Sequence, residues 1–215
     1  MLIGIVGFLG SGKGTVSDIL VKKYEFRSFA FADVLKDTVS VMFGWSRDLL
    51  EGDTDESRKF RETVDPFWDN RLDLGVPITP RYILQLMGTE AGRDVFGKDI
   101  WIHALDRCIA GVENVVLSDP RFPNEIDFIR KNHGMVTRVV RGPDPKWFDT
   151  ALDHNRGIAY DMPTKYPEVH VSEWAWIGST FDYVLNNDGS KAELEGSVKH
   201  MLDIYTGPVK LQKSA

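Results

Sequence analysis

The most informative segment of this chain is Gly7-Phe8-Leu9-Gly10-Ser11-Gly12-Lys13-Gly14-Thr15. It matches the pattern G-x-x-x-x-G-K of phosphate-binding loops. The apolar run Leu2 to Val6, rich in β-branched residues, precedes it and predicts a buried strand of a parallel sheet. Val16, Ile19 and Leu20 follow at helical spacing and predict an amphipathic helix. A strand, a glycine-rich loop and a helix in this order predict a P-loop.

This loop has the chemistry that a nucleotide phosphate requires. Its glycines let successive backbone N–H groups point inward at phosphate oxygens, and the following helix presents its positive dipole end to the same anion. Lys13 adds a mobile cation for the β and γ phosphates. We therefore expect the loop to bind ATP through the residues Gly10, Ser11, Gly12, Lys13, Gly14 and Thr15.

The residue after the lysine departs from the usual pattern. Most P-loop proteins place a magnesium-binding Ser or Thr there, whereas this chain has Gly14, with Thr15 one place later. The Gly-Lys-Gly-Thr form resembles that of nucleoside monophosphate kinases, and this resemblance implies that Mg²⁺ is held largely through water and phosphate oxygens. We expect Mg²⁺ as a cofactor without assigning a direct protein ligand. Thr15 is expected to bond an α or β phosphate oxygen, or else to be a first-turn helix hydroxyl.

The rest of the chain alternates strands with helices. Further strands are predicted around 27–31, 115–117, 135–140 and 183–186. Helices are predicted from Asp33 to Gly44, from Thr79-Pro80 to Gly88 or Gly92, from Asp99 to Gly111, from Asn124 to Asn132 and from Lys191 to Tyr205. This alternation predicts an α/β fold of the three-layer P-loop NTPase type with a mainly parallel sheet, in a single domain over residues 1–215.

A second group of candidate residues follows the strand at 115–117. Phosphoryl transfer requires cations that neutralise the transferred group. Arg121 lies just beyond this strand and Asp119 at its end, which places both at the carboxyl edge where α/β sheets bind ligands. We expect Arg121 to stabilise the phosphoryl group in transit and Asp119 to order magnesium and its waters. The alternatives are a surface arginine and a turn aspartate before Pro120.

Several further motifs together resemble the phage-type deoxynucleoside monophosphate kinases. They are the P-loop, the segment from Phe31 to Asp37, the pattern Arg81-x-x-x-Gln85-x-x-Gly88-Thr89 with Trp101 downstream, the Asp119-x-Arg121 turn, the strand from Thr137 to Arg141, and Asn187-Asp188-Gly189-Ser190. The resemblance spans most of the chain. It implies transfer of the γ-phosphate of ATP to a deoxynucleoside 5′-monophosphate (dNMP), giving the diphosphate (dNDP) and ADP.

The resemblance also implies acceptor contacts. Carried over by motif, these are Lys36, Asp37, Arg81, Gly88, Thr89 and Trp101. Lys36 and Arg81 can grip the acceptor phosphate, and Trp101 can offer a flat wall to a base or sugar. Arg58 matches a family arginine less securely, with Arg61 as its competitor. From spacing alone, Lys36 and Asp37 read equally as a solvated helix face.

Two regions carry the remaining functional expectations. Residues 44–100 are expected to form a helical acceptor-binding insertion. The long irregular region 141–178 is expected to be a lid, because long loops inside compact domains are usually functional. Arg141 and Arg156 are its candidate phosphate-facing cations. A closed lid excludes water and so disfavours hydrolysis of ATP.

Composition narrows the class of protein. The 215 residues are 42% hydrophobic with a formal net charge of -6, which is typical of a globular chain and argues against nucleic acid as a partner. We find no signal peptide and no membrane span. Cys108, the one cysteine, is expected to be buried and cannot form an intramolecular disulfide, so a reducing cytoplasm fits best, the host cytoplasm if the chain is phage-encoded. A homodimer is an expectation from the resemblance.

Three alternatives stay open. A kinase of another small phosphorylated metabolite, such as phosphomevalonate, resembles nucleoside monophosphate kinases in the P-loop and the Asp-x-Arg turn. A nucleotide-dependent switch would bind ATP or GTP without an acceptor, although the guanine motif Asn-Lys-x-Asp is absent from the sequence. His154 and His170 could suggest a metal site, but the spacing of potential ligands around them argues against one.

Overall fold

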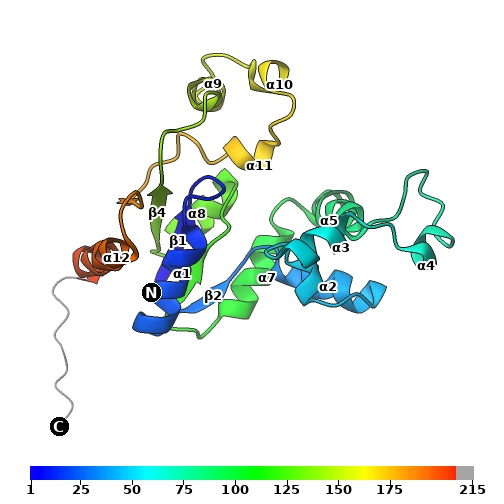
Figure 1. Cartoon of the computed structure of the whole chain (residues 1–215), viewed down its shortest axis with the longest axis horizontal. Coiled ribbons are helices and arrows are strands. Elements are labelled where there is room, and N and C mark those ends of the chain that lie inside the picture. Colours follow the sequence, from blue (N-terminus) through cyan, green and yellow to red (C-terminus); the bar gives the residue numbers. More distant parts are fainter. Residues whose placement is uncertain (207–215) are drawn as a thin grey trace, which may run out of the picture. The chain divides into compact units, whose positions relative to one another are not determined.

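The computed structural model describes residues 1–206, so residues 207–215 of the predicted domain lie outside the described residues. The chain divides into two compact units (Figure 1). Unit 1 comprises Met1–Ala30 and the chain from Gly111 onward, and unit 2 comprises Phe31–Ala110. The predicted lid, 141–178, falls in unit 1 and the predicted acceptor region, 44–100, falls in unit 2. That the chain is a single kinase domain stays a prediction.

Unit 1 is built on a five-stranded parallel sheet. Its strands are β1 (Leu2–Val6), β2 (Arg27–Phe29), β3 (Val115–Leu117), β4 (Met135–Val140) and β5 (Tyr183–Asn186), in the order β2-β3-β1-β4-β5. Its helices are α1 (Lys13–Tyr24), α8 (Pro123–Lys131), α9 (Phe148–Asn155), α10 (Met162–Lys165), α11 (Val171–Trp174) and α12 (Lys191–Thr206). Ile3 of β1 faces Val116 on one side and Met135 on the other, and all four strand pairings are parallel. The α/β fold with a parallel sheet is confirmed.

Helices cover both faces of this sheet. Ile3 and Ile5 are fully buried in a core cluster with apolar side chains of α1 and α12. Gly4 points to the opposite face because side chains alternate along a strand. There a Cβ on Gly4 would overlap the Ile129 side chain of α8, so only glycine allows this close packing. The predicted three-layer arrangement is confirmed.

The sheet order determines where the loops of unit 1 meet. β1 is the central strand, with β3 and β2 on one side of it and β4 and β5 on the other. Because all strands are parallel, the loops that follow them emerge at one edge. These loops are the P-loop after β1, the Asp119 turn after β3, the start of the lid after β4 and Asn187 after β5. In Figure 1 the P-loop joins the end of β1 directly to α1.

Unit 2 is helical. Its elements are α2 (Asp33–Phe43), the 3₁₀ turn η1 (Asp48–Leu50), α3 (Asp55–Glu62), α4 (Pro66–Asp69), α5 (Pro80–Gly88), the π-helical turn η2 (Thr89–Arg93), α6 (Asp94–Phe96) and α7 (Ile100–Ile109). Gly44 ends α2 in a left-handed conformation, and the Thr79 hydroxyl caps α5 by accepting the Tyr82 N–H at 3.2 Å. Both ends agree with the prediction. Leu35, Val39 and Ile83 lie in its buried core.

Two local predictions are wrong. The second strand stops at Phe29 rather than Phe31. Cys108 is exposed rather than buried, because α7 buries Ile102 and Leu105, and the helix turns Cys108 away from that stripe. A buried stripe of two residues is too narrow for the spacing of apolar residues to locate it.

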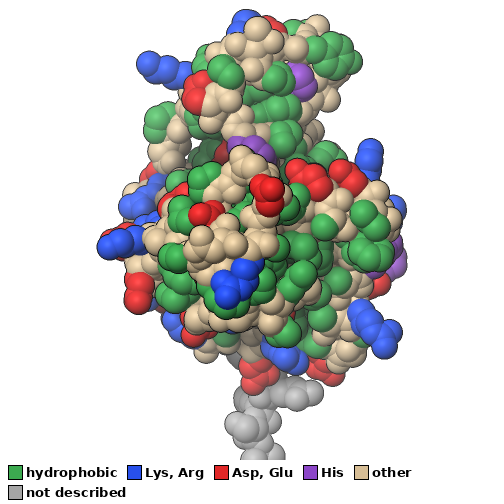
Figure 2. Space-filling model, turned by 90° about the vertical axis from the view of Figure 1, so that its right-hand side faces the viewer, with side chains coloured by type: hydrophobic (Ala, Val, Ile, Leu, Met, Phe, Trp, Pro, Cys, Tyr) green, Lys and Arg blue, Asp and Glu red, His purple; other side chains and the backbone are tan. Residues whose placement is uncertain are grey.

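The surface drawn in Figure 2 carries charged side chains of both signs. On the face drawn in Figure 2, basic and acidic side chains lie interspersed rather than gathered by sign. None of the helices within residues 1–206 has both the length and the apolar character that crossing a membrane requires. The absence of a nucleic-acid partner stays a prediction.

Candidate active site

The conformation of the P-loop in unit 1 depends on the backbone freedom of glycine and on an asparagine far away in the sequence. Gly12 has a φ of +101°, which side-chain-bearing residues rarely adopt. The Asn187 Nδ2 group, beyond the end of β5, donates a hydrogen bond to the Ser11 carbonyl at 2.8 Å. A Cβ on Gly12 would overlap this amide. Asn187 therefore braces the loop, and only glycine fits beside it.

Replacing Gly12 by alanine is expected to destabilise the protein. The left-handed conformation alone costs about 1–2 kcal/mol with a Cβ, and displacing Asn187 adds to this. In thermal unfolding we expect G12A to lower the Tm by at least ~2–4 °C.

Gly14→Ala is the matched control for G12A. No heavy atom of the described chain lies within 4 Å of a Cβ added at Gly14, which is helical, so its Tm should stay level or rise slightly. Equal Tm values for G12A and the wild type would contradict the strain at Gly12.

Lys13 folds back onto the loop. Its Nζ donates to the carbonyls of Gly7 at 2.7 Å and Phe8 at 2.9 Å. Burial is the main cause that lowers the pKa of Lys13, and the charge of Arg121 lowers it further, while Glu173 acts in the opposite direction. The structure therefore brings Lys13, Arg121 and Glu173 into one electrostatic neighbourhood. An anionic ligand between them would stabilise the charge of both cations.

Arg121 is held from both its backbone and its side chain. The carboxylate of Glu125, on α8, accepts the backbone N–H groups of Arg121 at 2.7 Å and Phe122 at 3.1 Å. The guanidinium Nη1 donates to Glu173 at 3.0 Å and to the Ser172 hydroxyl at 3.2 Å, both on α11. The charged head of Arg121 thus bonds to the predicted lid.

The other predicted phosphate-site residues lie at the same edge of unit 1 or in the lid. Asp119 is half-buried two residues after β3, and Thr15 is exposed in the first turn of α1. Arg141 is exposed directly after β4, and Arg156 is exposed at the C-terminal end of α9. The sheet topology thus places Asp119 and Arg141 on the strands that flank β1. Their contacts with ATP stay predictions.

Aromatic side chains join the P-loop to the lid. The Phe8 ring lies 5.3 Å from the Trp147 ring and 5.0 Å from the Trp176 ring, measured between centroids. The guanidinium carbon of Arg138, on β4, lies 5.6 Å from the Trp176 ring. These contacts pack the predicted lid against Phe8, the residue that follows the first glycine of the P-loop.

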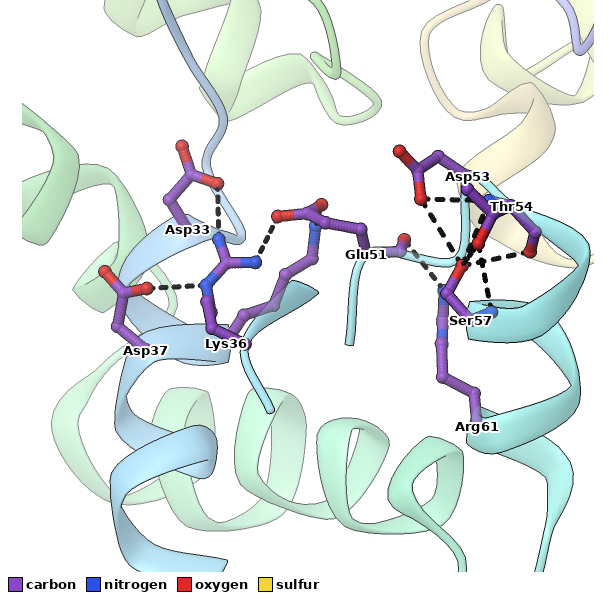
Figure 3. A network of polar contacts seen from close by, with 9 residues as sticks. Asp33, Lys36, Asp37, Glu51, Asp53, Thr54, Ser57 and Arg61 are labelled. Carbon is purple, nitrogen blue, oxygen red and sulfur yellow. Dashed lines mark hydrogen bonds and ion pairs between the residues drawn. The ribbon is translucent and has the colours of Figure 1, made fainter. Parts of the chain in front are cut away.

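The predicted acceptor residues Lys36 and Asp37 lie in an ionic cluster on α2 (Figure 3). Lys36 Nζ contacts the Glu51 carboxylate at 2.5 Å, and Asp37 accepts from Arg47 Nε at 2.5 Å. Burial by itself would raise the pKa of Glu51, but hydrogen bonds from Lys36 and Arg47 outweigh it and lower that pKa. The Glu51 carboxylate therefore stays ionised at neutral pH.

The Arg-x-x-x-Gln-x-x-Gly-Thr pattern lies along α5 and its end. Arg81, in the first turn, forms an ion pair with Glu62 of α3 and is half exposed. Gly88 is buried at the last position of α5, and Thr89 is exposed where the helix widens into the π-helical turn η2. Trp101 Nε1 donates to the Gly88 carbonyl at 2.8 Å. The structure thus joins Gly88 and Trp101, and π-helical turns are frequent at functional sites.

Arg58 and Arg61 have different surroundings. Arg58 is exposed, and it pairs with Asp55 at 2.9 Å and with the carbonyls of Gly52 and Asp53. Arg61 is half-buried and its Nη1 donates to the Glu51 carbonyl at 3.2 Å. Arg61 therefore lies against the segment that carries the ionic cluster. Which of the two contacts an acceptor stays a prediction.

No group of three His, Cys, Asp or Glu side chains within residues 1–206 is arranged to hold a metal ion. His154 stacks edge-on against Trp174, with 4.9 Å between centroids, and His170 Nδ1 accepts the Ser172 N–H at the start of α11. Both histidines thus have structural contacts in the lid.

Comparison with known proteins identifies the family. A protein of Acanthamoeba polyphaga mimivirus named a deoxynucleotide monophosphate kinase is 32% identical over 154 residues, which cover 66% of this chain and 74% of that protein. The chain belongs to the deoxynucleoside monophosphate kinase family. The deoxynucleoside-5′-monophosphate kinase of Escherichia phage T5 is 27% identical over 220 residues, covering 77% of this chain and 86% of that one. No protein-family model matches the sequence.

Membership in this family makes the chain an ATP-dependent phosphotransferase of the nucleoside monophosphate kinase type. Among solved structures, TT1252 from Thermus thermophilus superposes with a TM-score of 0.49 at 21% identity, covering 96% of this kinase and 98% of that chain. The shikimate kinase from Aquifex aeolicus superposes with a TM-score of 0.45 at 16% identity and the same coverage.

Several residues of this site were missed by sequence reasoning. Asn187 braces the P-loop, Glu173 holds Arg121, and Arg47 joins the carboxylates around Lys36. Glu125 was signalled by its place three residues after the N-cap of a helix that begins with Pro123, where a carboxylate often caps backbone N–H groups. For Glu173 and Arg47 no local pattern distinguishes them from other charged surface residues.

Proposed function

We propose that this kinase transfers the γ-phosphate of ATP to a deoxynucleoside 5′-monophosphate, giving the diphosphate and ADP. The observation that carries the proposal is that Lys13 folds onto the P-loop, with its Nζ on the Gly7 and Phe8 carbonyls, in a chain that belongs to this family. An acceptor phosphate is already a nucleophile, so the protein needs only to position both substrates and neutralise charge.

In unit 1, the P-loop would bind the phosphates of ATP. The loop glycines and the N-terminus of α1 turn backbone N–H groups toward an anion. The Ser11 hydroxyl is buried without a hydrogen-bond partner in the described chain. Because buried polar groups are normally hydrogen-bonded, this hydroxyl would be satisfied by donating to a phosphate oxygen. Lys13 would exchange the carbonyls of Gly7 and Phe8 for phosphate oxygens, and Arg121 would exchange Glu173 for the transferred group.

In unit 2, the acceptor would bind to the residues carried over from the family. Lys36 and Arg81 supply cations for its phosphate, although each is ion-paired in the free protein. Trp101 and Gly88 lie at the widened end of α5, where a nucleotide can approach the backbone closely. Asp37, Thr89 and one arginine of the pair Arg58 and Arg61 complete the proposed contacts.

Magnesium fits this site through oxygen donors. Thr15 and Asp119 place a hydroxyl and a carboxylate at the P-loop end of the sheet, and Mg²⁺ prefers oxygen ligands while keeping several waters. We propose that phosphate oxygens and water hold most of the ion and that Asp119 orders its waters. When bound, Mg²⁺ would neutralise charge on the β and γ phosphates.

A substrate panel tests the proposal. The full chain is incubated with ATP and Mg²⁺ together with each of the deoxynucleoside monophosphates, the ribonucleoside monophosphates and phosphomevalonate, and ADP and the phosphorylated product are quantified together. We expect ADP and a deoxynucleoside diphosphate to form in equal amounts with at least one acceptor. K13A, prepared in the same way, controls for contaminating kinases.

Other outcomes would replace the proposal. Turnover with phosphomevalonate alone would make the protein a kinase of another small metabolite, and ADP release that no acceptor changes would indicate a nucleotide-dependent switch. Homodimer formation and a cytoplasmic location stay predictions from the family resemblance and the composition.

A further inference from the structure

Arg47, which precedes η1, is the centre of the ionic cluster in unit 2. Its Nε donates to Asp37 at 2.5 Å, its Nη2 donates to Asp33 at 3.0 Å, and its Nη1 contacts Glu51. Asp33 and Asp37 lie one turn apart on α2, so one guanidinium ties this helix face to the segment that carries Glu51 (Figure 3). The Arg47 side chain is 26% exposed. Because three of its nitrogen atoms contact three different carboxylates, the Arg47 guanidinium is held more firmly than in a single surface ion pair.

Glu51 is shared between two cations. Its Oε2 contacts Lys36 Nζ at 2.5 Å while its Oε1 contacts Arg47. Burial would by itself lower the pKa of Arg47, but the hydrogen bonds to Asp37 and Glu51 outweigh it and raise that pKa. Arg47 therefore stays cationic whether or not Lys36 remains bound to Glu51. Only one of the two cations is a proposed contact of the acceptor.

The charges of the cluster constrain what Lys36 can do. Asp33, Asp37 and Glu51 carry three negative charges, and Lys36 with Arg47 supplies two positive ones. If Lys36 turns to an acceptor phosphate, Glu51 loses one counter-ion and would repel that phosphate. Arg47 is placed to keep Glu51 compensated at that moment, because it holds the other carboxylate oxygen.

We propose that Arg47 is a positioning residue for acceptor binding: it neutralises Glu51 so that Lys36 is free to leave Glu51 for the acceptor phosphate. The inference rests on the proposed function, in which Lys36 binds that phosphate. Within residues 1–206 the hydrogen bonds of the Arg47 side chain go to carboxylates, and we assign it no direct role in the transfer. Its loss should therefore weaken acceptor binding without changing ATP binding.

Steady-state kinetics of Arg47→Gln test this role. We expect the KM for the best deoxynucleoside monophosphate to rise by about tenfold or more, while kcat and the KM for ATP stay within about threefold. Arg47→Lys keeps the positive charge but cannot contact all three carboxylates in the same geometry. Its acceptor KM should therefore lie between those of R47Q and the wild type. Arg71→Gln is the matched control, because Arg71 is exposed in the same unit and its side chain contacts the Phe67 carbonyl and ring rather than any carboxylate of the cluster.

A double mutant separates positioning from direct contact. If Arg47 acts by compensating Glu51, removing that charge in R47Q/E51Q should return the acceptor KM to within about threefold of E51Q alone. A defect of the same size with and without Glu51 would mean that Arg47 contacts the acceptor itself, and would overturn the proposal.

The outcomes distinguish this inference from the proposed function. A wild-type protein that phosphorylates no deoxynucleoside monophosphate would refute the proposed function. A wild-type protein that does so, with folded R47Q showing an acceptor KM within twofold of it, would refute the role of Arg47 alone. Thermal unfolding of each variant establishes that it is folded.

Discussion

Replacing Lys13 by alanine is expected to lower kcat at least ~100-fold, which corresponds to about 2.7 kcal/mol of lost transition-state stabilisation. In the free protein the amine is half-buried and bonds two loop carbonyls, which preorganises it beside the loop. Charge accumulates on the β and γ phosphate oxygens during transfer, and no other lysine lies in the P-loop to replace it. The measurement is steady-state ADP formation with the best acceptor at saturating ATP.

Lys22→Ala is the matched control for K13A. Lys22 lies near the other end of α1, is exposed and pairs only with Asp18 at 3.2 Å, an i,i+4 pair worth about 0.3–0.5 kcal/mol. Its kcat should stay within about twofold of the wild type. A folded K13A protein with near-normal turnover would refute the assignment of this P-loop to ATP.

Replacing Arg121 by alanine is expected to lower kcat by a similar factor, at least ~100-fold. Its backbone is held by Glu125, so the guanidinium starts from a defined point at the carboxyl edge of the sheet. Burial is the main cause that lowers the pKa of Lys13, and the charge of Arg121 lowers it further, so the two cations influence each other. Because the effect arises in the transition state, kcat should fall more than the KM for ATP changes. The measurement is the same kinetic assay.

Glu173→Gln tests whether Arg121 acts on the transferred phosphoryl group or only holds the predicted lid. If Arg121 served only to hold the lid, losing its ion pair from either side should reduce kcat equally. If Arg121 acts on the transferred group, E173Q should keep kcat within about threefold, since only an exposed pair is lost. Matching large losses in R121A and E173Q would assign Arg121 to the lid instead.

Much of the fold could be predicted from local patterns. β1, β3, β4 and β5 have the predicted bounds, and α2 ends at the predicted Gly44. Apolar runs and capping residues are local features, so the sequence shows them directly. The exposed Cys108 marks the limit of this approach. Which side of a helix is buried depends on what packs against it, and spacing alone could not place the narrow stripe of α7.

For the same reason, some residues of the candidate site could be predicted from the sequence and others could not. The P-loop residues, Asp119 and Arg121 were identified because each directly follows a strand, and parallel strands end at one edge. Lys36 and Asp37 could not be separated from a solvated helix face, and their network with Arg47 appeared only in the fold. The acceptor assignments came from family motifs rather than from spacing.

By itself, the sequence determined the P-loop, the alternation of strands and helices, and membership in a kinase family, because these depend on the order of neighbouring residues. The tertiary structure alone decided that Asn187 braces Ser11, that Glu173 holds Arg121 and that Arg47 compensates Glu51. The first two contacts join residues 176 and 52 positions apart. Such pairs meet only after the sheet and its helices have packed, and no local periodicity records them.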